Sequence, residues 1–238
     1  MRPLPLYTLF CAAVLTLLPR LPGQTVVNGG FESPVYEEGN FEYAGPELYV
    51  DNEEYSGPEV PGWTFTGRAG VSSANSPWTP QGGASSQFAF LQIGGDSYPA
   101  SALFQTVRFN TAGTFTLSYL AGRRNLDFDD NPTAVNYSIS LTRTFNSSVV
   151  FSASEAISGG QEVSEFSYTV SLAAVGDYEL RFTVDDMGEL SDRAMSIDSV
   201  AFASVAAIPE PSTYAAMAGG AVLLGTLWRR RRQRAASA

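Results

Sequence analysis

The feature that most limits the fold of this chain is a series of short segments in which apolar and polar residues alternate or β-forming residues are concentrated. A period of two places successive side chains on opposite faces of a strand, as in a sheet with one face in the core and one in water. Gly, Asn, Asp and Pro separate the segments, which is typical of turns between strands. The segments are 88–93, 102–109, 113–120, 135–141, 149–153, 166–172, 176–184 and 195–202.

Strands at this spacing predict an all-β fold, an antiparallel β-sandwich of the jelly-roll type. No amphipathic helix of convincing length occurs outside the C-terminal tail. We expect one domain over residues 24–205, because about 180 residues are ample for one domain with its own core. Residues 36–60 carry many acids, no basic residue and four tyrosines, and they predict an acidic loop insertion. This insertion is either a flap that faces a ligand or a solvated loop.

The N-terminal residues 1–23 have the pattern of a secretory signal peptide. Arg2 supplies the positive start, and an apolar core follows over residues 6–18. Prolines then precede the small residue Gly23, where we expect cleavage. The pattern predicts a signal helix that starts export.

The C-terminal residues 206–238 carry three further elements in order. A rigid polar element contains Pro209, Glu210 and Pro211, and an apolar stretch follows over 214–228. This stretch has 15 residues and predicts one C-terminal transmembrane helix, although spanning helices usually need about 20. The stretch ends in a basic cluster, which places the C-terminus in the cytoplasm. The cluster consists of Arg229, Arg230, Arg231 and Arg232.

The order of these three elements closely resembles the PEP-CTERM sorting signal of Gram-negative bacteria. The resemblance implies recognition by an exosortase-type enzyme and cleavage near Pro209-Glu210-Pro211. It also implies a transient anchor in the inner membrane, followed by the cell surface or the extracellular matrix, often in organisms that produce exopolysaccharide. The alternative is an ordinary C-terminal anchor that contains Pro-Glu-Pro by accident.

Composition excludes several kinds of chemistry. The chain has no histidine, which removes histidine bases and histidine metal ligands, and its one cysteine, Cys11, lies in the leader. Residues 25–207 hold 7 arginines against 23 acidic residues, a formal charge of −16. Such a body repels phosphate, so we expect no nucleic-acid partner. The acidity suits solubility outside the cell or calcium binding.

Several landmarks along the body resemble galactose-binding-like jelly rolls, including many carbohydrate-binding modules. Residues 27–32 (VNGGFE) resemble the first strand of such domains, and 61–63 (PGW) the step that follows it. Further resemblances in chain order are 90–92 (FLQ), 104–107 (FQTV), 112–123 (AGTFTLSYLAGR), 174–182 (AVGDYELRF) and 196–200 (SIDSV). The acidic insertion departs from the pattern.

The same resemblance implies a structural calcium ion held by Glu32 and Asp198, since a first-strand glutamate and a last-strand aspartate bind calcium in such modules. Calcium prefers hard oxygen ligands and would join the two terminal strands. The alternative is that both acids hydrogen-bond to loop backbone. Residues 127–131 (DFDDN) begin like an EF-hand loop, but Pro132 stands where glycine is needed, so they predict an acidic hairpin loop.

Exposed aromatic rings are the usual platform for sugars, because a flat ring covers the apolar face of a sugar. Trp78 and Tyr98 lie in loops rich in Pro and Gly and are our candidate ligand-binding rings, with Arg123 as a donor to hydroxyl groups. Trp63, in the PGW step, is expected in the core. No acidic residue lies in a motif with an assignable catalytic role, so we expect no enzyme.

Three functions remain open at this point. The first is an exported, noncatalytic surface or matrix protein that binds polysaccharide. The second is a purely structural matrix protein without a sugar site, and the third is a small glycan-active enzyme.

Overall fold

The computed structural model describes residues 26–44, 48–50, 53–55, 57–83, 86–93, 100–125, 134–184 and 193–205, together with Gly219, Gly220, Leu224 and Thr226. The chain divides into two compact units, Met1–Ser204 and Val205–Ala238. The expected signal helix, Tyr98, residues 127–131, the Pro-Glu-Pro element and the arginine cluster lie outside the described residues. In the described parts of the chain, no helix is long and apolar enough to cross a membrane.

The first unit is an all-β antiparallel sandwich, as the alternating segments predicted. Its six-stranded sheet has the order β1-β5-β6-β13-β8-β11. The bounds of these strands are Phe41–Tyr43 (β1), Ala69–Ser73 (β5), Gln87–Gln92 (β6), Ala194–Ser204 (β13), Gly113–Arg123 (β8) and Ser164–Leu172 (β11).

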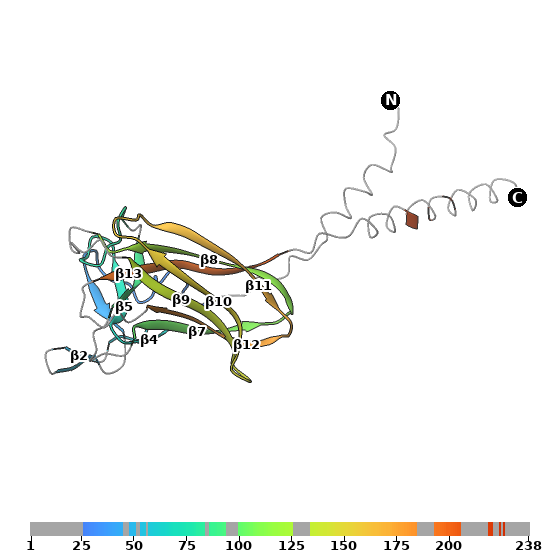
Figure 1. Cartoon of the computed structure of the whole chain (residues 1–238), viewed down its shortest axis with the longest axis horizontal. Coiled ribbons are helices and arrows are strands. Elements are labelled where there is room, and N and C mark those ends of the chain that lie inside the picture. The colour runs from blue at the N-terminus through green and yellow to red at the C-terminus, as the bar shows by residue number, and fades with distance from the viewer. Residues whose placement is uncertain are drawn as a thin grey trace, which may run out of the picture. The chain divides into compact units, whose positions relative to one another are not determined.

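The second layer is a five-stranded sheet with the order β10-β9-β12-β7-β4. Its strands are Ser148–Ile157 (β10), Val135–Arg143 (β9), Gly176–Val184 (β12), Ala102–Phe109 (β7) and Thr64–Thr66 (β4). The two sheets lie face to face, with β7, β9, β10 and β12 in one layer and β8, β11 and β13 in the other (Figure 1).

One apolar core fills the space between the sheets. Alternate residues of the long strands enter it, for example Leu117 and Tyr119 of β8 and Leu180 and Phe182 of β12. Burial of each such side chain stabilises the fold by about 1.5–3 kcal/mol relative to exposure. Trp63 belongs to this core, as the sequence predicted. The core residues and strand pairs of the described part of the chain lie in the first unit, so that unit has its own core and can fold by itself.

Part of the acidic segment 36–60 forms strands, which corrects the prediction of a loop insertion. β1 pairs with β5 and extends the six-stranded sheet, and β2 (Leu48–Val50) pairs with β3 (Glu53–Tyr55) as a separate two-stranded sheet. Phe41 and Tyr43 of β1 pack against a second apolar cluster. These two aromatic side chains gain burial only if the segment docks on the sheet, which is why β1 is ordered as a strand.

Residues 27–30 form a turn, although their motif resembled a first strand. The turn is held by both sheets: the Val27 N–H donates to Gln105 Oε1 at 2.7 Å, and the Val200 N–H donates to the Gly29 carbonyl at 2.9 Å. The Trp63 indole N–H donates to the Asn28 carbonyl at 3.0 Å. Phe31 then enters the core. These contacts place Glu32 beside the strand β13.

Candidate functional site

Glu32 and Asp198, the predicted calcium ligands, come together on either side of Gly30. A Cβ atom on Gly30 would lie 3.7 Å from both Asp198 Oδ1 and Glu32 Cγ. Asp198 precedes an irregularity in the register of β13, and Ser199 has a φ of 53°. Bulges of this kind re-aim side chains locally. The absence of a side chain at Gly30 leaves a small space between the Asp198 carboxyl group and the Glu32 side chain.

Both carboxyl groups accept hydrogen bonds at this point. Asp198 Oδ1 accepts from the Ser199 N–H at 2.5 Å, and Glu32 Oε1 accepts from the Ser86 hydroxyl at 2.5 Å. Burial raises the pKa of Asp198 to about 6; the hydrogen bonds from Ser199 lower it, and the charge of Glu32 raises it further. A cation would supply a compensating charge to these two neighbouring carboxyl groups.

The donor set fits a calcium ion in kind. Both side chains offer hard oxygen atoms, and the space at Gly30 separates them. Among the residues that the structure describes, no group of three or more His, Cys, Asp and Glu side chains lies together. Glu32 and Asp198 would therefore hold calcium only with backbone or solvent oxygens as additional ligands.

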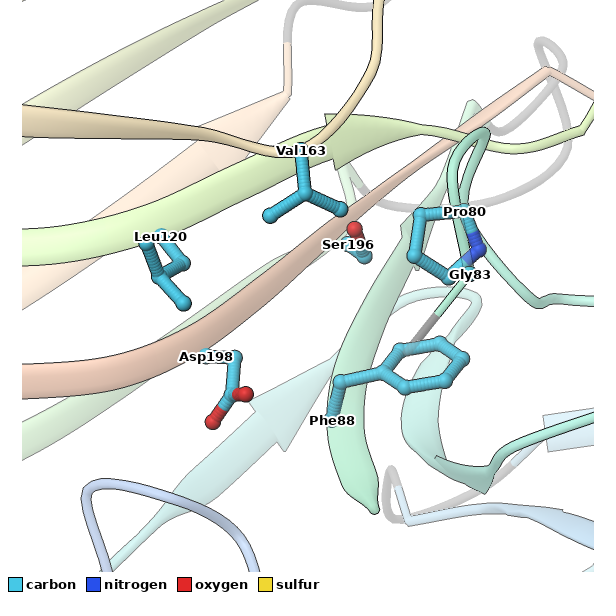
Figure 2. A pocket seen from close by; sticks show the side chains of 7 residues that line it. All are labelled: Pro80, Gly83, Phe88, Leu120, Val163, Ser196 and Asp198. Carbon is cyan, nitrogen blue, oxygen red and sulfur yellow. The ribbon is translucent and has the colours of Figure 1, made fainter. Parts of the chain in front are cut away.

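A cavity of about 180 Å³ opens beside Asp198. Leu120, Ser196 and Asp198 alternate with core residues along β8 and β13, so they point away from the space between the sheets. Apolar side chains surround the cavity, with the Asp198 carboxylate at one side of it (Figure 2). Its lining consists of Pro80, Gly83, Phe88, Leu120, Val163, Ser196 and Asp198.

Trp78 does not form an exposed platform, which corrects the prediction that it binds a ligand. Its exposed fraction is 6%, and its ring stacks on Phe90 with centroids 4.6 Å apart and planes 1° apart. The Arg124 guanidinium carbon lies 4.3 Å from the ring centroid. The segment after β5 folds back over the outer face of the six-stranded sheet, so the ring covers apolar side chains of the protein itself.

Arg123 is also buried, with an exposed fraction of 0%, so it does not present a donor at the surface. Its Nη1 donates to the Ala194 carbonyl at 3.2 Å, which links β8 to the start of β13. The sequence proposed Arg123 as a donor to the hydroxyl groups of a ligand. The alternation itself continues to Arg123 and turns its side chain inward.

Sequence reasoning missed a polar surface on the outer face of the five-stranded sheet, which we call the outer polar face. Strand register sets Thr64, Phe104, Arg181 and Ser140 in one row across four strands. The Arg181 guanidinium carbon lies 4.0 Å from the Phe104 ring centroid, and Arg181 Nε donates to Glu179 Oε1 at 2.9 Å.

Hydroxyl groups surround this row. Thr106 and Thr142 flank Glu179 in the next row, and Ser138 lies beside Thr183. All these side chains are exposed or half-exposed. A face with fixed donors, fixed acceptors and one apolar ring can bind a chain of sugar hydroxyls. The polar residues at every second position of 102–109 and 176–184 could have indicated this face. Which of them lie side by side depends on the strand register, which the sequence does not show.

The comparison with family models concerns the tail. Residues 207–232 match the PEP-CTERM protein-sorting motif. The motif implies processing by an exosortase-type enzyme and marks an exported or cell-surface protein. No curated protein sequence matches the chain.

The sandwich is similar to solved structures at low sequence identity. A structure of TmCBM61 in complex with β-1,4-galactotriose is 12% identical, covers 76% of this chain and 99% of that chain, and has a TM-score of 0.50. A CBM4 structure is 14% identical and covers 76% of this chain and 100% of that chain, with a TM-score of 0.45. The N-terminal cellulose-binding domain of β-1,4-glucanase C from Cellulomonas fimi is 15% identical, with coverages of 62% and 91% and a TM-score of 0.42. The first likeness shows a shared fold.

Proposed function

We propose that this chain is an exported, noncatalytic surface or matrix protein that binds polysaccharide and is processed at its sorting motif. The observation that carries the proposal is the position of the sorting motif: it begins at residue 207, directly after a sandwich whose last strand ends at Ser204. The sandwich is then the part of the chain that remains outside the cell. Its acidic, histidine-free composition supports a binding role over a catalytic one.

The tail acts in this proposal as a temporary anchor. Residues 214–228 hold the chain in the inner membrane, with Arg229–Arg232 in the cytoplasm. An exosortase-type enzyme cuts near Pro209-Glu210-Pro211, and the body moves to the cell surface or the matrix.

We expect the exported protein to lack the residues that follow Pro211. Mass spectrometry of the protein recovered from the native host measures the C-terminal residue directly. A variant with Pro209→Ala and Pro211→Ala should retain the tail and stay in the membrane fraction. The control, Pro99→Ala, changes a proline outside the motif and should be cut like the parent. Exported protein that still ends at Ala238 contradicts the processing step.

The outer polar face supports binding of a neutral or weakly charged polysaccharide. Arg181 is positioned by Phe104 on one side and Glu179 on another, so its guanidinium is already fixed before a ligand arrives. Fixed donors lose little conformational freedom on binding, which favours affinity. The ligand source in this proposal is an exopolysaccharide of the surrounding matrix.

Arg181→Ala is expected to weaken binding of the preferred polysaccharide about tenfold, since a hydrogen bond to a charged group contributes about 1.5–3 kcal/mol. A glycan array with residues 24–205 identifies the ligand, and calorimetry measures the change. The matched control is Arg108→Ala. Arg108 lies on the same face of the five-stranded sheet as Arg181, but it pairs with Asp177 at 3.1 Å and is more exposed than Arg181. Equal losses for both variants would reject a specific role of Arg181 in binding. An array without any binder would favour a purely structural matrix protein.

We also propose that Glu32 and Asp198 hold a structural calcium ion. The cation would neutralise two adjacent carboxylates and link the N-terminal turn to β13. Support comes from the space at Gly30, the hard oxygen donors and the raised pKa of Asp198.

A further inference from the structure

The cavity beside Asp198 combines apolar walls with one acidic group. Phe88 and Pro80 form one wall, and Leu120 and Val163 lie around the remainder of the hollow (Figure 2). Such a cavity offers apolar contact to the faces of a ligand and one acceptor at its side. It lies on the six-stranded sheet, whereas the outer polar face lies on the other sheet.

The charge around this cavity is negative. Asp198 lines it, Glu32 lies beside Asp198, and the side chain of Glu162 packs against Gly82, next to the lining residue Gly83. None of the seven lining residues is basic. A ligand with a positive charge would therefore compensate the two adjacent carboxylates, which a neutral ligand would not do.

The volume limits the ligand to a small body. A cavity of 180 Å³ equals the liquid volume of roughly six water molecules. Pockets for drug-sized ligands have about 300–1,000 Å³, so this cavity accommodates one ring rather than an oligomer. A compact ring also loses less conformational freedom on binding than an extended side chain would.

We propose that this cavity binds a single hexosamine residue with a free amino group, presented by a cationic polysaccharide. The sugar ring lies against the half-exposed side chains of Leu120 and Val163, and its ammonium group donates to the Asp198 carboxylate. The inference rests on the proposed polysaccharide binding only for the class of ligand, because it concerns a different surface. It applies to the protein without calcium, since the ammonium group and the ion would share the Asp198 carboxylate.

The test compares four probes in chelator, so that calcium does not occupy the carboxylates. They are a glucosamine tetramer, the N-acetylglucosamine tetramer, cellotetraose and tetralysine, each titrated into residues 24–205 with methyl NMR as the readout. We expect the glucosamine tetramer to shift the Leu120 and Val163 methyl signals and to bind at least tenfold more tightly than its acetylated form. Equal binding of the acetylated form, or of tetralysine, would overturn the proposal.

Two variants separate the charge from the shape of the cavity. Asp198→Asn removes the charge and should weaken glucosamine binding about tenfold, while Val163→Phe fills the cavity and should abolish it. The matched control Glu165→Gln removes an exposed carboxylate that faces Leu120 from β11, and it should leave affinity within about twofold.

Unchanged affinity in Asp198→Asn, or methyl shifts confined to the other sheet, would reject the cavity as the site. If the protein then still binds a neutral polysaccharide and this binding requires Arg181, the proposed function stands. Loss of both kinds of binding would reject the proposed function as well.

Discussion

Replacement of Trp78 by alanine is expected to lower the free energy of unfolding of the sandwich by about 3–5 kcal/mol. The ring stacks on Phe90, contacts Phe41 and Tyr43 edge to face, and is covered by Arg124. Its removal leaves a cavity over β6 and withdraws the apolar surface against which β1 is docked. Urea denaturation of residues 24–205, followed by fluorescence or circular dichroism, measures the change.

The control for this prediction is Phe145→Ala, because Phe145 is 88% exposed and its loss should change stability by no more than about 0.5 kcal/mol. Trp78→Phe, which keeps a ring on Phe90, should lose less stability than Trp78→Ala and bind polysaccharide like the parent. A loss below about 1 kcal/mol in Trp78→Ala would show that the stack contributes little. Weaker sugar binding by a fully folded Trp78→Phe variant would show that Trp78 takes part in ligand binding.

The strands with one solvent-exposed face could be predicted from the sequence almost to the residue. The alternating segments 102–109 and 176–184 coincide with β7 and β12. Such strands carry a polar residue at every second position, so the period of two is visible in the sequence. β10 and β13 extend beyond the segments 149–153 and 195–202, because residues at strand ends pair without a clear alternation.

The strands β5 and β1 could not be recognised in the same way. All five residues of β5 are buried. The core covers one face of the strand, the loop that carries Trp78 lies on the other face, and β1 pairs along its edge. A strand buried on both faces has no polar side and so no alternation. β1 has three residues within an acidic segment, and its pairing with β5 depends on a contact distant in sequence.

The candidate site shows the same limit. The resemblance to carbohydrate-binding modules paired Glu32 with Asp198, and the structure places these two side chains near each other. A resemblance of this kind can pair residues that are distant in sequence. The ligand role of Trp78 was inferred from loop composition, and that of Arg123 from its donor groups. Neither signal reveals what packs over a side chain. Arg181 and Phe104 were missed because their row across the outer polar face depends on strand register.

Without calcium, the free energy of unfolding is expected to fall by up to about 3 kcal/mol as the pH rises from about 4 to 7. The pKa of Asp198 is about 6 in the folded state, against 3.8 for an ordinary aspartate, as in the unfolded chain. Between these values the folded state holds a proton that the unfolded state has lost, so stability decreases with pH. The figure is an upper bound because Asp198 is half-buried and solvent screens part of the interaction.

Calcium should reverse this loss at neutral pH, since the ion binds the ionised carboxylates of Glu32 and Asp198. At a concentration of about one hundred times its Kd, a ligand adds about 2.7 kcal/mol, which raises Tm by about 5–10 °C for a domain of this size. Urea titrations from about pH 4 to 8, in chelator and in calcium, measure both effects. Asp198→Asn should flatten the pH dependence in chelator and remove the response to calcium, whereas the control Glu179→Gln should retain both. An identical Tm for the parent protein in chelator and in calcium would reject the metal site. If the stability of Asp198→Asn depends on pH as that of the parent does, the burial of the Asp198 carboxylate is not the cause of the pH dependence.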